Sequence, residues 1–179
     1  IQIRKGAVSV TSNAASDDRP LKRTLLVFGY KPGQELSPFN GMNEFLSALV
    51  LSRELDGIVP EKSLIIVTGC IEATIPFRSN DKKGRSPAEL LAERLQLTNR
   101  KLDLGMDEKD ILLAVEWSVI FANKDVQNFA EEDIGRFLDN TWKLLPETNP
   151  SLRTSGIYSI SSYRNALQKM VGFLGFLDP

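Results

Sequence analysis

Four side chains in the sequence have the chemistry that catalysis needs. They are the thiol of Cys70 and the carboxylates of Glu72, Asp110 and Glu116. Cys70 ends a long apolar run and could act as a nucleophile at the end of a strand, although a free cysteine more commonly packs as a small core residue. The three carboxylates could hold Mg²⁺, as in enzymes that act on nucleic acid, if their segments are neighbours. Otherwise they lie on solvated faces.

The sequence contains no histidine and a single cysteine. Without histidine, the Ser-His-Asp triad, the Cys-His pair and histidine-built zinc sites are excluded. Glycine-rich phosphate-binding loops and the nucleophile elbow are absent from the sequence too. We therefore expect no cofactor and assign no catalytic or metal-binding residue. Carboxylate and magnesium chemistry is the one enzymatic alternative, and the expectation leans away from an enzyme.

A basic loop is the first candidate binding site. Its cations are Arg78, Lys82, Lys83 and Arg85, with Phe77 beside them. Such cations contact phosphates in a salt-dependent way, and an aromatic ring can stack on a base. The loop therefore predicts contact with nucleic acid or another anionic surface, unless it is simply a solvated loop.

The C-terminal segment 170–179 is the second candidate, because it is apolar where chains usually fray. Its partner-binding side chains would be Phe173, Leu174, Phe176 and Leu177. An exposed apolar tail would dock on a protein partner, on another copy or on a membrane surface. The alternative is that the tail packs into the core.

The elements that position these residues are predicted from apolar spacing and from helix-start signals. Serine followed by proline opens two predicted helices, at Ser37-Pro38 and at Ser86-Pro87, and Glu89 completes a capping box at the second. Two more helices are expected over 127–145 and after Ser161 or Ser162.

Strands are expected over 1–10, 21–30, 64–71, 111–121 and 156–160, with a buried helix as the alternative for 111–121. The fold class is therefore α/β or α+β, a single compact domain over 1–179. It would have a mixed sheet of about 4–6 strands, about 4 helices and a mobile loop over 11–20.

Part of the sequence resembles OmpA-like peptidoglycan-binding domains. Asp81-Lys82-Lys83-Gly84, followed by Leu90 and Arg94, is similar to the Asp-x-x-Gly … Leu-Ser-x-x-Arg pattern of that family, and the expected strand–helix order over 25–119 is similar as well. The resemblance implies that Asp81 and Arg94 would grip the diaminopimelate of a peptidoglycan stem peptide. We keep it as an alternative to the leading hypothesis.

Composition supports an ordinary soluble globular protein. The 179 residues carry a net charge of −1, and 42% of them are hydrophobic. This gives no overall attraction to nucleic acid or lipid, and no apolar run is long enough for a membrane span. A lone cysteine suits the reducing cytoplasm without excluding the periplasm. The chain starts at Ile1 rather than Met, which is consistent with removal of a leader. The leading hypothesis is a non-catalytic binding or assembly protein, such as a viral or phage structural protein or a bacterial adaptor, with a protein partner or a second copy as its ligand.

Overall fold

The computed structural model of the chain describes residues 2–4, 7–11, 18–37, 40–76, 78–143, 152 and 157–174. The chain divides into two compact units, Ile1–Asp125 and Val126–Pro179. The expectation of a single domain over 1–179 stays a prediction.

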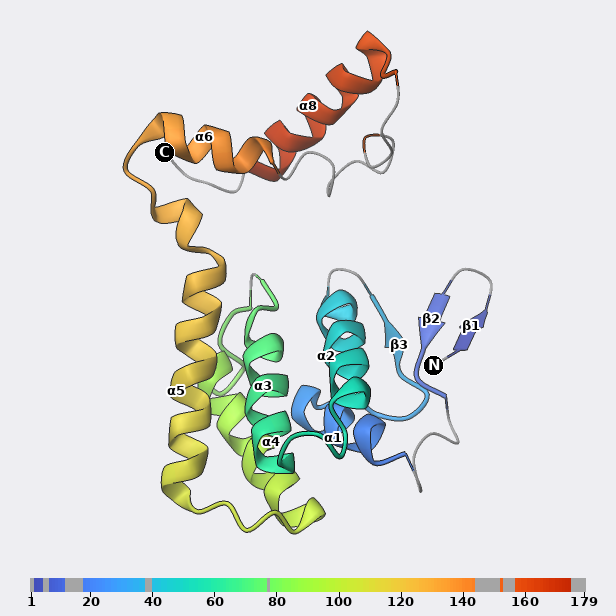
Figure 1. The fold of residues 1–179 in the computed structure, drawn as a ribbon, viewed down its shortest axis with the longest axis vertical. Coiled ribbons are helices and arrows are strands. Elements are labelled where there is room, and N and C mark those ends of the chain that lie inside the picture. Colours follow the sequence, from blue (N-terminus) through green and yellow to red (C-terminus); the bar gives the residue numbers. More distant parts are fainter. Residues whose placement is uncertain are drawn as a thin grey trace. The chain divides into compact units, whose positions relative to one another are not determined.

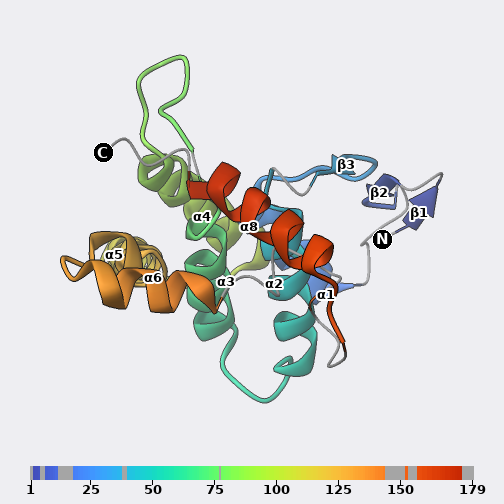
Figure 2. The same cartoon turned by 90° about the horizontal axis from the view of Figure 1, so that it is seen from above.

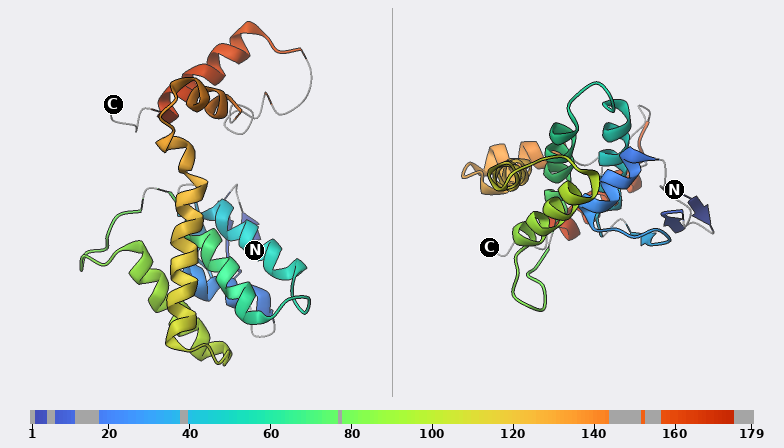
Figure 3. Two further views of the ribbon diagram at one scale, coloured as in Figure 1. Left: turned by 60° about the vertical axis from the view of Figure 1, so that its left-hand side comes forward. Right: turned by 90° about the horizontal axis from the view of Figure 1, so that it is seen from below.

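Five helices form the body of the first unit (Figure 1). They are α1 (Arg19–Phe28), α2 (Met42–Glu54), α3 (Glu61–Ala73), α4 (Pro87–Leu102) and α5 (Glu108–Asp125). Helix α3 packs against each of the other four. Figure 3 shows α5 lying along α3. The first unit is therefore a helical bundle built around α3.

A small antiparallel sheet accompanies the bundle. Its short strands are β1 (Gln2–Arg4), β2 (Ala7–Ser9) and β3 (Glu35–Leu36), paired in that order. Ile3 lies opposite Val8, and Val8 lies opposite Leu36. Figures 1 and 2 place the sheet on the side of the unit away from α5.

The prediction of a mixed sheet of 4–6 strands is wrong, because most of the described chain is helical. Three segments expected to be strands, 21–30, 64–71 and 111–121, lie in α1, α3 and α5. For 111–121 the helical alternative is the correct one. The predicted strand over 156–160 is not observed in the described residues, since Ile160 begins a helix. Only the strand expected over 1–10 has counterparts, in β1 and β2.

Helix α1 forms where a strand was expected because its ends carry strong helix signals. Asp18 is the N-cap, and its carboxylate accepts a hydrogen bond from the Leu21 backbone N–H at 3.0 Å. Gly29 ends the helix at φ +70°, a conformation that glycine adopts without strain. Residues 12–17 of the predicted mobile loop lie outside the described residues, and its last two residues belong to α1.

Helix α3 misled the strand prediction because it is apolar on several sides. A helix surrounded by other helices does not need a polar face, so its sequence resembles a buried strand. Thr68 is buried there, and its hydroxyl donates to the Leu64 carbonyl at 2.6 Å. This local bond satisfies the hydroxyl inside the bundle.

The helices opened by serine and proline agree better with the structure. The capping box at Ser86 is confirmed, because its hydroxyl accepts from the Glu89 N–H and the Glu89 carboxylate accepts from the Ser86 N–H. Helix α2 also occurs, but its N-cap is Gly41 rather than Ser37.

The core of the first unit joins all five helices to the sheet. Phe28, Tyr30 and Phe45 form an aromatic cluster with ring centroids 5.2–5.6 Å apart. The fully buried side chains of the same core include Val10, Val27, Ala48, Ile65, Leu95 and Ala114. Their burial supplies the main stabilisation of the bundle.

A buried arginine ties α1 to α2 and α3. Arg23 has no exposed surface, and its guanidinium donates to the Ser52 hydroxyl at 2.6 and 3.0 Å and to the Ser52 carbonyl at 3.1 Å. It also pairs with Asp56 and Glu61, each at 3.1 Å. Arg19 binds the same Glu61 through two bonds of 2.6 and 2.7 Å. The buried positive charge of Arg23 is therefore compensated by hydrogen bonds and by two carboxylates.

The described residues of the second unit form a short 3₁₀ helix, η2 (Gln127–Ala130), and the α-helices α6 (Ile134–Trp142) and α8 (Ile160–Leu174). The helix predicted over 127–145 is thus divided into η2 and α6, because Asp133 caps a new helix by accepting from the Arg136 N–H. The predicted last helix is confirmed as α8. Ala166 and Met170 of α8 pack with Leu152. None of the described helices is both long enough and apolar enough to cross a membrane.

Candidate functional site

Two of the four cations of the basic loop are paired with neighbouring carboxylates. Arg85 pairs with Asp81 at 2.7 Å and with Glu93 at 2.6 Å, and Arg78 pairs with Glu72 at 2.5 Å. Lys82 and Lys83 are exposed and form no ion pair with any described residue. The loop therefore keeps two uncompensated cations of the four predicted. Phe77 lies outside the described residues.

Asp81 and Arg94, the two residues of the peptidoglycan hypothesis, both form hydrogen bonds with other residues of this chain. The Asp81 carboxylate accepts from the backbone N–H groups of Lys83 and Arg85 at 2.8 and 3.0 Å, and hydrogen bonding with the Arg85 side chain lowers its pKa. Arg94 donates to the Val27 carbonyl at 2.7 Å and to Glu72 at 2.5 Å. The helical fold also removes the strand–helix order on which the resemblance rests.

Glu72 is the centre of a buried ionic cluster instead of a metal site. Its side chain is 2% exposed, and one oxygen, Oε1, accepts from both Arg78 and Arg94. Its other oxygen, Oε2, and the Nε of Arg78 have no hydrogen-bond partner among the described residues. Burial raises the pKa of Glu72, and burial lowers the pKa of Arg94.

A cavity of about 280 Å³ opens beside this cluster. Glu72, Arg78 and Arg94 line it together with Tyr30, whose hydroxyl donates to the Asn40 carbonyl and whose pKa is raised by burial. The unpaired acceptor on Glu72 and the unpaired donor on Arg78 are groups that water or a small polar molecule would satisfy.

The three carboxylates expected to hold Mg²⁺ are not brought together. Glu72 is paired as described, Asp110 pairs with Lys62 at 3.3 Å, and Glu116 is exposed on α5. In the part of the chain that the structure describes, no three acidic, histidine or cysteine side chains are arranged to hold a metal ion. Cys70 is half-buried in α3, and burial raises the pKa of its thiol.

The four side chains of the predicted tail site lie outside the described part of the chain. Phe173 and Leu174 belong to the last turn of α8, and their side chains lie outside the described part, as do Phe176 and Leu177 entirely. The proposal that this segment binds a partner stays a prediction.

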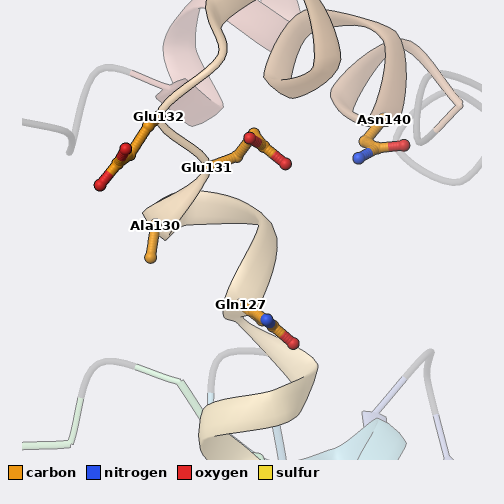
Figure 4. Close-up of a pocket in the computed structure, with 5 residues that line it drawn as sticks. All are labelled: Gln127, Ala130, Glu131, Glu132 and Asn140. Atoms are coloured by element: carbon orange, nitrogen blue, oxygen red, sulfur yellow. The ribbon is translucent and has the colours of Figure 1, made fainter.

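An open hollow of about 510 Å³ lies within the second unit, between η2 and α6 (Figure 4). Its lining is mainly polar, and Figure 4 shows Glu131 directed toward Asn140, with Glu132 on the opposite side of the chain. No cation is among the described residues that line it. The hollow therefore offers hydrogen-bond acceptors without a charge that would hold an anion.

Helix α5 carries the feature that sequence reasoning missed. Leu113, Trp117, Ile120 and Phe121 are 40%, 50%, 57% and 49% exposed. They follow one another at helical spacing and so lie on one face, which we call the α5 outer face. The adjoining face, with Ile111, Ala114 and Ser118, is buried where α5 packs against α3 and α4. The strand interpretation did not show this arrangement. With the helical period of 3.6 residues the apolar residues of α5 divide into a buried set and an exposed set, whereas with the strand period of 2 they do not.

Comparisons with family models, with curated proteins and with solved structures found no match for this chain.

Proposed function

We propose that this chain is a non-catalytic assembly protein that pairs with a second copy of itself through the α5 outer face. The observation that carries the proposal is the exposure of four large apolar side chains in one continuous stripe, two of them aromatic. Contiguous apolar patches on a protein surface commonly mark interaction sites, and tryptophan is enriched among the residues that dominate binding energy.

The charges at the two ends of the stripe support a second copy as the partner. Asp110, which also pairs with Lys62 of α3, lies near the start of α5 and Lys124 lies near its end. Helical spacing places both beside the outer face. If two copies of α5 pair antiparallel about Trp117, Asp110 of each copy lies opposite Lys124 of the other. Leu113 then lies opposite Phe121. The opposed helix dipoles favour the same orientation.

Such a pairing is isologous, because each copy contributes the same surface. The apolar stripe would supply the buried centre of the interface, and the charged ends would form its rim. An assembly role needs no reactive group, so it agrees with the occupied state of the arginines and carboxylates described above.

The test is the oligomeric state, measured by sedimentation equilibrium. The wild-type chain should dimerise, and Trp117→Ser with Ile120→Ser should weaken the dimer at least about 30-fold, as expected for loss of a central tryptophan. The matched control replaces exposed apolar residues elsewhere in the first unit, Val50→Ser with Ile58→Ser, which are 60% and 73% exposed. The control should dimerise like the wild type.

Two results would contradict the proposal. One is a wild-type chain that stays monomeric across the accessible concentration range. The other is a dimer that the α5 variant leaves unchanged while its circular dichroism shows an intact fold.

A further inference from the structure

A groove of about 420 Å³ lies in the first unit between α1, the turn at residues 29–32 and α4. Its volume is in the range typical of sites for small molecules. Tyr30 and Arg94 line both this groove and the smaller cavity beside Glu72. The groove is distinct from the α5 outer face, since it shares no residue with it.

Three lysines surround the groove, one from each of the segments that form it. They are Lys22 of α1, Lys31 of the turn and Lys101 of α4. None of them forms an ion pair with another described residue, and no carboxylate is among the lining residues. Arg94 shares the Glu72 carboxylate with Arg78, so its charge is offset only in part. The lysines therefore leave the groove with three uncompensated positive charges, which favours an anionic ligand.

The surface between the lysines is apolar. Leu25 and Leu26 come from α1, Leu97 from α4 and Pro32 from the turn. Leu97 is 38% exposed, so part of this surface is open to a ligand. A small inorganic anion would leave the apolar surface uncovered, whereas a ligand that joins an apolar body to an anionic group would use both parts of the lining.

Gly29 helps to shape one wall. A Cβ at this position would lie 2.9 Å from the Cδ of Arg94, so the chain approaches Arg94 more closely than a side chain would allow. Arg94 is held in place by its bonds to the Val27 carbonyl and to Glu72. The wall formed by Gly29, Tyr30 and Arg94 is therefore fixed before any ligand binds.

We propose that this groove binds a phosphate monoester that carries an apolar substituent. A phosphate monoester has a charge of about −1.5 to −2 at pH 7 and three strong acceptor oxygens. These match three lysine ammonium groups better than the single charge of a carboxylate does. The apolar substituent would lie on the leucines, and the concave shape selects one molecule rather than a flat surface.

Octyl phosphate is a direct probe, used below its micellar concentration with the intact chain and followed by two-dimensional NMR. Inorganic phosphate tests the charge without the tail, and octyltrimethylammonium tests the tail with the opposite charge. Octyl phosphate should bind at least about tenfold more tightly than either. It should shift the amide signals of Leu26, Tyr30 and Leu97. Equal affinity for inorganic phosphate or for octyltrimethylammonium would overturn the proposal.

Variants locate the binding. Lys22→Gln with Lys101→Gln should weaken octyl phosphate at least about tenfold, and Leu97→Ser should weaken octyl phosphate without changing inorganic phosphate. The matched control is Lys109→Gln with Lys169→Gln, two exposed lysines of α5 and α8 outside the groove, which should bind like the wild type. Unchanged binding by the Lys22 and Lys101 variant would refute the site.

Two further measurements distinguish the groove from a lipid-binding surface and from the α5 outer face. Vesicles containing phosphatidate, at equal phosphate concentration, should bind no better than octyl phosphate; tighter binding to the vesicles would show that a lipid surface is the true ligand. The variant Trp117→Ser with Ile120→Ser should keep its affinity for octyl phosphate. The groove proposal therefore stands even if the chain does not dimerise. The assembly proposal likewise stands even if octyl phosphate does not bind.

Discussion

Gly69 of α3 and Ser118 of α5 meet where the two helices cross, and a Cβ on Gly69 would lie 3.1 Å from the Ser118 Oγ. The Ser118 hydroxyl donates to the Ala114 carbonyl at 2.7 Å, so it cannot turn away freely. The absence of a side chain at Gly69 therefore lets α5 pack close to α3.

This crossing gives the first prediction. Gly69→Ala normally stabilises a helix by up to about 1 kcal/mol, but here the added methyl group should offset that gain by pressing on Ser118. Gly69→Val should lower the free energy of unfolding by about 1–3 kcal/mol, as overpacking does. Urea denaturation measures both changes.

Two controls sharpen this test. Gly172→Ala, in α8, meets no atom within 4 Å and should be neutral or stabilising. Ser118→Ala should recover part of the stability lost in Gly69→Val, because it removes the oxygen that the new side chain meets. A Gly69→Val variant as stable as the wild type would refute the close contact.

The second prediction concerns the buried arginine. Arg23→Leu removes every bond to Ser52, Asp56 and Glu61, and should cost about 3 kcal/mol of unfolding free energy, as breaking a buried ion pair does. Arg53→Leu is the matched control. Arg53 is 53% exposed and pairs with Asp18 at 2.6 Å, so its loss should cost less than about 1 kcal/mol. If both variants lose a similar amount of unfolding free energy, the buried bonds of Arg23 stabilise the fold no more than an exposed ion pair does.

The third prediction is a dependence of stability on pH. Burial raises the pKa of Glu72 above its ordinary value of 4.5 in the folded chain. The folded state then holds this proton at pH values where the unfolded state has released it. Stability of the wild type should therefore fall as pH rises from 4.5 through the folded-state pKa, relative to Glu72→Gln, which cannot titrate.

The comparison is made by urea denaturation of both proteins at a series of pH values. Glu61 serves as the opposite case, because its hydrogen bond to Arg19 lowers its pKa. Its contribution to stability is present above its ordinary pKa of 4.5 and should be lost as pH falls through the lowered value. A wild type that gains stability over Glu72→Gln as pH rises would contradict the raised pKa.

The fourth prediction gives the orientation of the proposed dimer. In a Cys70→Ser background, Leu113→Cys and Phe121→Cys chains are prepared separately and then mixed under oxidising conditions. Antiparallel pairing about Trp117 places position 113 of one copy near position 121 of the other, so mixed disulfide dimers should predominate. A parallel dimer would instead favour disulfides between identical variants, and an unrelated contact would give none above the level of Leu112→Cys.

The sequence predicted helices α2 and α4, where serine followed by proline marks the start. The capping box at Ser86 is read directly from residue types, because serine and glutamate bond to backbone groups only one turn away. The strand prediction is wrong at α1, although Asp18 gives that helix a polar start, and at α3. At α5 the helical alternative is the correct one. The run of apolar residues from Leu64 to Ile71 satisfies both a buried strand and a helix that other helices surround, and only tertiary contacts decide between them.

The sites were harder to predict than the helices. Arg85 and Arg78 could be recognised as cations, but their neutralisation by Glu93 and Glu72 depends on which elements lie side by side. The groove lysines are spread from position 22 to position 101. No local spacing connects them. The outer face of α5 was visible in the sequence as an apolar run, but the wrong period concealed that two stripes, one buried and one exposed, share it.

The lone thiol of the chain lies at the crossing of α3 and α5. Cys70 follows Gly69 directly, and its Sγ lies 3.9 Å from the Ser118 Oγ. A buried thiol with a raised pKa reacts slowly with alkylating reagents, since only the accessible thiolate reacts. Detachment of α5 would expose this sulfur, so the rate of alkylation under native conditions reports the free energy of that local opening. With one cysteine in the chain, the protein carries its own single-site reporter of how firmly its last bundle helix is held.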